Sequence, residues 1–147
     1  GSFGDVTVKS IHRNRVPCRI VRAGQSAAVC LDSFIPCLRN GMVLVSRETT
    51  ARGCLFFQAN VSVLFHATAI YPGFQITIHI GNIRQTAVVI GIFASQCITT
   101  NERDSVLFKF KNHPEYVTVG QRLLFREGSA KGIGEVTQVF PLQTVPN

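Results

Sequence analysis

Two short segments carry side chains that suit contact with the sugar-phosphate backbone of RNA. The first is Arg84-Gln85-Thr86, which offers a guanidinium, an amide and a hydroxyl, and in the second Arg126 and Lys131 flank a short loop. Arginine and lysine bind phosphate oxygens, whereas hydroxyls and exposed main chain contact ribose 2′-hydroxyls. These residue types therefore predict recognition of an RNA backbone.

Residues able to perform catalysis are not grouped in this sequence. The histidines are scattered, and none has the nucleophile, positioned base and orienting acid of covalent catalysis; they are His12, His66, His79 and His113. If His66 and His79 met across a sheet, they would still lack a third metal ligand. The acidic residues form no pair suited to general acid/base chemistry. We predict neither a catalytic nor a metal site in this chain.

The glycine-rich segment Gly128–Gly134 does not have the pattern of a nucleotide site. A phosphate loop ends in Gly-Lys-Ser/Thr and leads into a helix, whereas Lys131 here is followed by glycine and the segment has the pattern strand, turn, strand. We therefore expect no bound GTP, magnesium or other cofactor in this chain.

Composition points to a soluble protein with an anionic partner. The 147 residues include 15 Lys and Arg against 8 Asp and Glu, for a net charge of +7, which favours RNA, DNA or an acidic protein surface. No apolar run is long enough to cross a membrane. The 5 cysteines are odd in number and none are spaced as a zinc or redox pair, so they predict reduced thiols in a cytoplasmic protein.

Period-two alternation of apolar residues predicts an all-β chain with two units. Residues 47–53 lack large apolar side chains and are expected to link a partial β-barrel, residues 1–50, to a complete six-stranded antiparallel closed barrel, residues 51–147. The strands expected in the complete barrel are Cys54–His66, Phe74–Ile80, Ile83–Phe93, Val106–Phe110, Arg122–Glu127 and Lys131–Phe140. Shorter strands are expected at Val6–Ser10, Val16–Val21, Ala27–Leu31 and Met42–Ser46.

Phenylalanines are expected to pack the barrel interior or an interface between barrels and not to stack on bases. These residues are Phe57, Phe65, Phe74, Phe93, Phe108, Phe110 and Phe125. Phe108-Lys109-Phe110-Lys111 comes nearest to the alternation of aromatic and basic residues in an RNA-recognition sheet.

The order of segments resembles the C-terminal part of elongation factor Tu-like translational GTPases. Residues 56–140, with Ala59–His66, Tyr71-Pro72-Gly73-Phe74, Gln85-Thr86-Ala87 and the hairpin Gly120–Val136, resemble the third domain of elongation factor Tu and of eukaryotic elongation factor one-alpha. Residues 6–46 resemble the second half of the second domain. The segments Val8–Arg13 and Arg122–Gly128 are most similar to the branch named GTP-binding proteins one and two, as is Ala67, where elongation factor one-alpha has proline.

This resemblance implies a location and a role for the basic residues. In elongation factor Tu the third barrel grips the T-stem of tRNA with the loop matching Arg126-Glu127-Gly128 and with the segment around Thr86. Glu127 is then expected to accept a hydrogen bond from a ribose 2′-hydroxyl. The resulting candidate RNA-binding residues are Arg84, Gln85, Thr86, Arg126, Glu127, Gly128 and Lys131.

The resemblance also implies a larger parent protein. It implies an upstream GTPase domain that holds GTP and magnesium and packs on this fragment, and tRNA or ribosomal RNA as partner. The alternative is a protein-docking barrel for exchange or ribosome-rescue factors that makes no RNA contact.

Overall fold

The computed structural model describes residues 3–35, 38–49, 51–65 and 69–142, and every regular element among them is a β-strand. The chain divides into two compact units, Phe3–Leu38 and a larger unit that begins at Arg39. The all-β prediction is confirmed. Among the described residues, none belongs to a helix that is long and apolar enough to cross a membrane.

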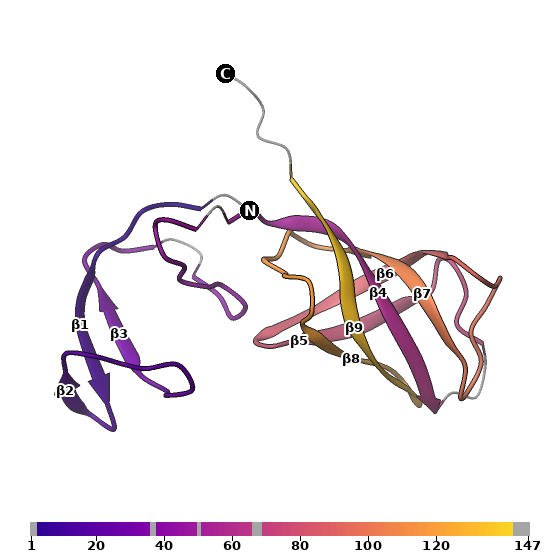
Figure 1. Ribbon diagram of the computed structural model, residues 1–147, viewed down its shortest axis with the longest axis horizontal. Coiled ribbons are helices and arrows are strands. Elements are labelled where there is room, and N and C mark those ends of the chain that lie inside the picture. The colour runs from indigo at the N-terminus through magenta and orange to yellow at the C-terminus, as the bar shows by residue number, and fades with distance from the viewer. Residues whose placement is uncertain (1–2, 36–37, 50, 66–68, 143–147) are drawn as a thin grey trace, which may run out of the picture. The chain divides into compact units, whose positions relative to one another are not determined.

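The first unit is an open sheet of three antiparallel strands. They are β1 (Val8–Arg13), β2 (Val16–Cys18) and β3 (Ala28–Leu31), in the order β2-β1-β3 (Figure 1). A two-residue turn joins β1 to β2, and both of its residues have positive φ, 50° at Asn14 and 66° at Arg15. This is the conformation that the right-handed twist of a hairpin favours.

The larger unit contains a closed barrel, as predicted. Its strands are β4 (Cys54–Phe65), β5 (Gln75–Ile80), β6 (Ile83–Ile92), β7 (Arg103–Phe110), β8 (Arg122–Glu127) and β9 (Ala130–Pro141). Their order around the barrel is β4-β7-β6-β5-β8-β9, all neighbours are antiparallel, and β9 pairs back onto β4 (Figure 1). Closure removes the unpaired edges that an open sheet carries.

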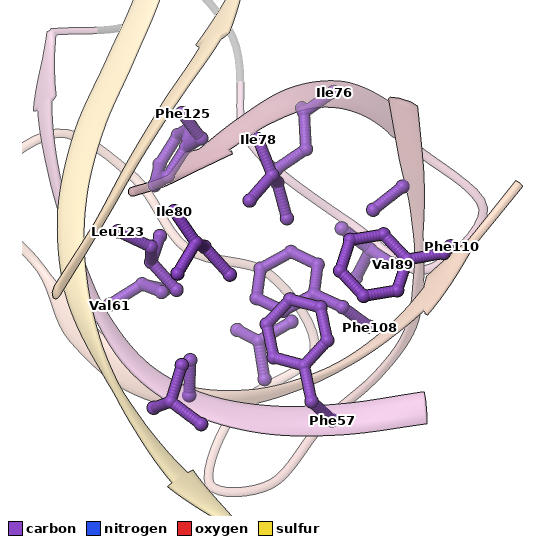
Figure 2. Packing of buried hydrophobic residues seen from close by; sticks show 14 of the residues in the cluster. Phe57, Val61, Ile76, Ile78, Ile80, Val89, Phe108, Phe110, Leu123 and Phe125 are labelled. Atoms are coloured by element: carbon purple, nitrogen blue, oxygen red, sulfur yellow. The ribbon is translucent and has the colours of Figure 1, made fainter. Parts of the chain in front are cut away.

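Alternate residues of each strand fill the barrel. Figure 2 shows the rings of Phe57, Phe108 and Phe110 together in the interior, where Phe57 lies 5.3 Å from Phe108 and 5.0 Å from Phe110, centroid to centroid. Phe108, Phe110 and Phe125 are at most 1% exposed, so their predicted packing role is confirmed. Phe74 is partly buried and packs against this core.

Phe93 lies just beyond β6 and is 61% exposed, so it is outside the core, and its alternative role at an interface between barrels stays a prediction. One expected strand is absent. Met42–Ser46 forms no strand, because no neighbouring strand pairs with it. His66, expected at the end of the first barrel strand, and Ala67, one of the residues of the family resemblance, lie outside the described residues.

The segment expected to link the units lies within the larger one. The unit boundary falls between Leu38 and Arg39, upstream of residues 47–53. Residues 39–41 attach to the barrel through the Arg39 side chain, which forms an ion pair with Glu115.

Candidate nucleic-acid interface

The two segments expected to contact RNA lie on one part of the barrel wall, separated by a single strand. Strand β5 pairs with β6 on one side and with β8 on the other. Thr77 of β5 is opposite Thr86 of β6 and opposite Arg126 of β8. Arg126 is in turn opposite Lys131 of β9. Neighbouring strands are about 4.8 Å apart, so Thr86 and Lys131 are about 14 Å apart measured along the barrel wall, and their strands β6 and β9 are three apart in both directions around the barrel. We call these four residues the cross-strand row.

The row faces away from the core. Ile76 and Ile78, which flank Thr77 along β5, are buried, so the period of two directs Thr77 outward. Arg126 and Lys131 are exposed, and Thr77 and Thr86 are half-buried. The row therefore presents two hydroxyls and two cations on the outer surface.

Arg84 extends this surface by one further residue pair. It is exposed, lies two residues before Thr86 on the same face of β6, and is opposite His79 of β5. In the described part of the chain, Arg84, Arg126 and Lys131 make no side-chain hydrogen bond or ion pair. Their charges are therefore available to an anionic ligand.

The hairpin loop expected between β8 and β9 is present. Glu127 is opposite Ala130, which leaves Gly128 and Ser129 as a two-residue loop with Gly128 at φ 56°. A glycine at the first loop position suits a tight hairpin, because it adopts positive φ without strain. Glu127 is exposed beside Arg126, and its carboxylate has no ion-pair partner among the described residues.

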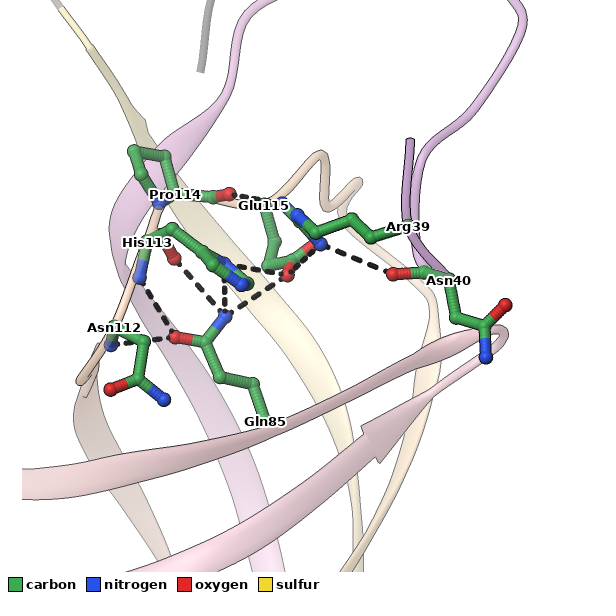
Figure 3. Close-up of polar contacts among 7 residues, drawn as sticks. All are labelled: Arg39, Asn40, Gln85, Asn112, His113, Pro114 and Glu115. Atoms are coloured by element: carbon green, nitrogen blue, oxygen red, sulfur yellow. Dashed lines mark hydrogen bonds and ion pairs between the residues drawn. The ribbon is translucent and has the colours of Figure 1, made fainter. Parts of the chain in front are cut away.

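Gln85 does not share this outer surface, which corrects its grouping with Arg84 and Thr86. Its side chain is buried, because alternation along β6 turns it to the other face. Its amide nitrogen donates to Glu115 Oε1 at 3.0 Å, and its amide oxygen accepts from the backbone N–H groups of Asn112 and His113 at 2.8 and 3.1 Å. Figure 3 shows Gln85 pointing from its strand toward His113 and Glu115. Its role in this structure is to hold the loop that contains His113 and Glu115.

Glu115 is the centre of this buried network, which the sequence did not reveal. Its side chain is 3% exposed and lies 2.9 Å from Arg39 Nη1 and 3.1 Å from His113 Nδ1. Burial, with the Glu115 charge as a second cause, raises the pKa of the Cys54 thiol to about 11. Gly41 has φ 96°, and a Cβ there would lie 3.2 Å from Glu115 Oε2, so a side chain larger than glycine is disfavoured beside the ion pair. The network therefore fixes residues 39–41 to the barrel.

Sequence reasoning missed one cation next to the cross-strand row. Lys111 follows β7, its backbone N–H donates to Thr86 O at 2.9 Å, and its Nζ donates to Gln75 Oε1 at 3.1 Å. Its signal was the alternation Phe108-Lys109-Phe110-Lys111, in which the buried phenylalanines place both lysines outside.

The glycine-rich segment Gly128–Gly134 does not form a phosphate loop. The glycines from Gly128 to Gly134 lie in the β8–β9 hairpin, so no helix N-terminus follows them to receive a phosphate. Within the described ranges, no three His, Cys, Asp or Glu residues are grouped as metal ligands.

Comparison with known proteins gives strong sequence relatives. The chain is 51% identical over 140 residues to GTP-binding protein 2 of Mus musculus and of Homo sapiens, and 40% identical over 141 residues to GTP-binding protein 1 of Xenopus laevis. Each alignment covers 95% of this chain, but only 23% of the mouse and human proteins and 21% of the frog protein. No family model matches the chain. Over nearly its whole length, the chain is therefore similar to one segment, less than a quarter, of GTP-binding proteins 1 and 2.

Proposed function

We propose that this chain is the non-catalytic C-terminal module of a translation-associated GTP-binding protein, and that it binds tRNA or ribosomal RNA. The observation that carries the proposal is the convergence of two segments about 40 residues apart in sequence on one outer surface. Arg84 and Thr86 on β6 and Arg126 on β8 flank β5 there, and Lys131 on β9 continues the row around the barrel. The three cations have no anionic partner in the described chain. Similarity to GTP-binding proteins 1 and 2 supports the parent class.

The chemistry of this surface suits a polynucleotide backbone better than a single small anion. Measured along the barrel wall, the cations are about 5 to 14 Å apart across the strands, and two threonine hydroxyls lie in the same row. Arg and Lys neutralise successive phosphates, and hydroxyls hydrogen-bond to phosphate or ribose oxygens. The exposed Glu127 carboxylate repels phosphate, but it accepts a hydrogen bond from a 2′-hydroxyl, which favours RNA over DNA.

We place GTP and magnesium in another part of the whole protein. A phosphate cradle and a magnesium-binding hydroxyl are needed to hold them, and the described residues supply neither. In this proposal the barrel packs against the parent's own GTPase domain, and the nucleotide state alters RNA affinity by moving one rigid body against the other.

One observation favours the alternative function, a docking barrel for exchange or ribosome-rescue factors. Leu124 and Ile133 are cross-strand neighbours on the outer surface, and they are 56% and 42% exposed. Leu124 is opposite His79 of β5, which is in turn opposite Arg84 of β6, so the apolar pair and Arg84 belong to one cross-strand line. An apolar pair beside cations is also typical of protein interfaces.

RNA binding measured against salt concentration separates the two functions. The test variant is Arg84→Ala with Lys131→Ala, and tRNA affinity is measured by fluorescence anisotropy at several salt concentrations. Loss of two phosphate contacts is expected to flatten the slope of log affinity against log salt by about 1 to 2 units. Duplex DNA of equal length is expected to bind more weakly than tRNA.

The matched control removes two cations that lie outside the cross-strand row. Arg103 is exposed at the start of β7, before the residues of β7 that pair with β6, and Arg52 is exposed before β4. Arg103→Ala with Arg52→Ala is expected to leave most of the affinity and slope in place. Equal losses in both double variants, or unchanged tRNA affinity in the first, would replace RNA binding at this surface with the docking function.

A further inference from the structure

The three-stranded sheet contains a pocket that the proposed RNA surface of the barrel does not use. It has a volume of about 530 Å³ and is lined by His12, Asn14, Arg15, Ser26, Ala27 and Ala28. This volume is within the range of small-molecule sites. All of these residues belong to the unit Phe3–Leu38.

Local backbone geometry brings these residues together. His12, near the end of β1, is opposite Ala28 at the start of β3. Asn14 and Arg15 form the turn into β2 with φ values of 50° and 66°. Ser26 and Ala27 lead into β3, so the turn and the approach to β3 meet at the same end of the sheet. Ala27 and Ala28, which have only methyl side chains, also line the pocket.

The polar groups that line the pocket are able to donate hydrogen bonds. Imidazole, primary amide, guanidinium and hydroxyl groups each carry at least one N–H or O–H, and no carboxylate is among the lining residues. Within the described part of the chain, the side chains of His12, Asn14, Arg15 and Ser26 form no hydrogen bond or ion pair. Four free donor groups around one space match an anion with several acceptor oxygens.

The charge distribution of the sheet supports this assignment. The unit has two acidic residues, Asp5 and Asp32, against five basic ones, which are Lys9, Arg13, Arg15, Arg19 and Arg22. Asp32 Oδ1 accepts from the backbone N–H of Thr7, just before β1, at 3.0 Å. His12 lies near the other end of β1, five residues from Thr7 and so about 17 Å from it along a strand that rises about 3.4 Å per residue. Asp32 therefore does not neutralise the pocket.

We propose that this pocket binds a phosphate group, with the Arg15 guanidinium as the cation and His12, Asn14 and Ser26 as hydrogen-bond donors. Two sources supply that chemistry, the backbone of an RNA and a free phosphate ion. We assign the RNA backbone, and this part of the inference rests on the proposed RNA-binding function. The pocket then gives the chain a second phosphate contact, separate from the cross-strand row of the barrel.

The test variant is Arg15→Gly, and its matched control is Arg19→Gly. The change at Arg15 creates Asn-Gly, the preferred sequence for a turn with two positive φ values, so the hairpin is preserved. Arg19 is an exposed arginine of the same unit that does not line the pocket. Two-dimensional NMR of the whole 147-residue chain monitors the His12 ring and the Ser26 amide during titration with inorganic phosphate and with single-stranded RNA.

We expect RNA to shift both signals in the wild type and in Arg19→Gly, and not in Arg15→Gly. The slope of log RNA affinity against log salt is expected to flatten by about 0.7 to 0.9 units in Arg15→Gly, which corresponds to one phosphate. Shifts with inorganic phosphate alone, and unchanged RNA binding in Arg15→Gly, would overturn the RNA assignment and retain a free-phosphate site. No shift with either ligand would overturn the pocket altogether.

Comparison with Arg84→Ala/Lys131→Ala separates this inference from the proposed function. If the barrel double variant weakens RNA binding while Arg15→Gly and Arg19→Gly match the wild type, the pocket is wrong and the barrel surface stands. If only Arg15→Gly weakens binding, the pocket stands and the barrel surface is wrong. Losses in both support two separate contacts.

Discussion

The barrel and the three-stranded sheet are built from similar residues, yet only the barrel buries its apolar side chains. In the barrel each strand has two neighbours, and inward side chains such as Phe57 and Ile78 are fully buried. In the described residues from Phe3 to Leu38 no side chain is buried, and Val16 and Phe34 are 62% and 90% exposed. β-propensity and alternation are therefore insufficient for a core, because an open sheet of three short strands has no second layer to pack against.

This difference predicts where the stability of the chain resides. Burial of apolar surface is the dominant favourable contribution to folding, and here it is concentrated in β4 to β9. Paired substitutions, one in each region, test this directly.

Phe57→Ala is expected to be the most damaging substitution. The Phe57 ring is 0% exposed and contacts two other rings, so its removal leaves a cavity and costs about 3 to 5 kcal/mol of unfolding free energy. Val29→Ala in β3, where the side chain is 41% exposed, is expected to cost less than about 1 kcal/mol. Urea denaturation followed by circular dichroism measures both. Equal costs would mean that the sheet has a core of its own.

Gly132→Ala tests the tightness of the barrel wall. A Cβ at Gly132 would lie 2.0 Å from Phe125 Cζ and 2.7 Å from the backbone oxygen of Ser62, so β8 or β4 must shift. Overpacking of this kind costs about 1 to 3 kcal/mol. Gly4→Ala is the control outside the barrel, because nothing lies within 4 Å of its Cβ position. A thermal midpoint that is unchanged by Gly132→Ala would contradict the close packing of β9 against β4 and β8.

Arg39→Ala tests whether the ion pair with Glu115 holds residues 39–49 on the barrel. It leaves the Glu115 carboxylate, 3% exposed, without its cation and is expected to cost about 2 kcal/mol, the scale of a hydrogen bond to a charged group. Residues 39–49 are then expected to detach, which increases the rate of tryptic cleavage after Arg47. The control is Arg52→Ala, another arginine close to this segment. Unchanged cleavage in Arg39→Ala would show that other contacts hold the segment.

Local pattern was enough to predict the barrel from the sequence. Alternation predicted six strands with boundaries within three residues of those observed, and Glu127-Gly128-Ser129 predicted the closing loop. These features depend on residues adjacent in sequence. The strand expected at Met42–Ser46 failed because alternation reports an exposed and a hidden face but not the presence of a pairing partner.

The site was only partly predictable. Arg84 and Arg126 were identified by type, but Gln85 was grouped with them although the period of two places it on the opposite face. Thr77 and Lys111 complete the outer surface through strand pairing, and Arg39 reaches Glu115 across 76 positions of the chain. Such long-range contacts depend on strand order and leave no signal in one sequence.

The labelling rates of two cysteines, one in each region, compare burial in the barrel and in the sheet without any substitution. Burial raises the pKa of Cys54 in the barrel to about 11, whereas Cys30 in the sheet is exposed. Because the thiolate is the reactive form, iodoacetamide at pH 8 is expected to label Cys30 quickly and Cys54 only on unfolding. Mass spectrometry of tryptic peptides follows both rates, and equally fast labelling would contradict the burial of Cys54 in the barrel.

The raised pKa of Cys54 also makes the stability of the fold depend on pH. The unfolded thiol loses its proton near its ordinary pKa of 9.0, while the folded one keeps it to about 11, so the unfolded state binds fewer protons in this window. The unfolding free energy is therefore expected to fall as pH rises from about 9 to 11. Cys54→Ala is expected to show a smaller fall over the same range.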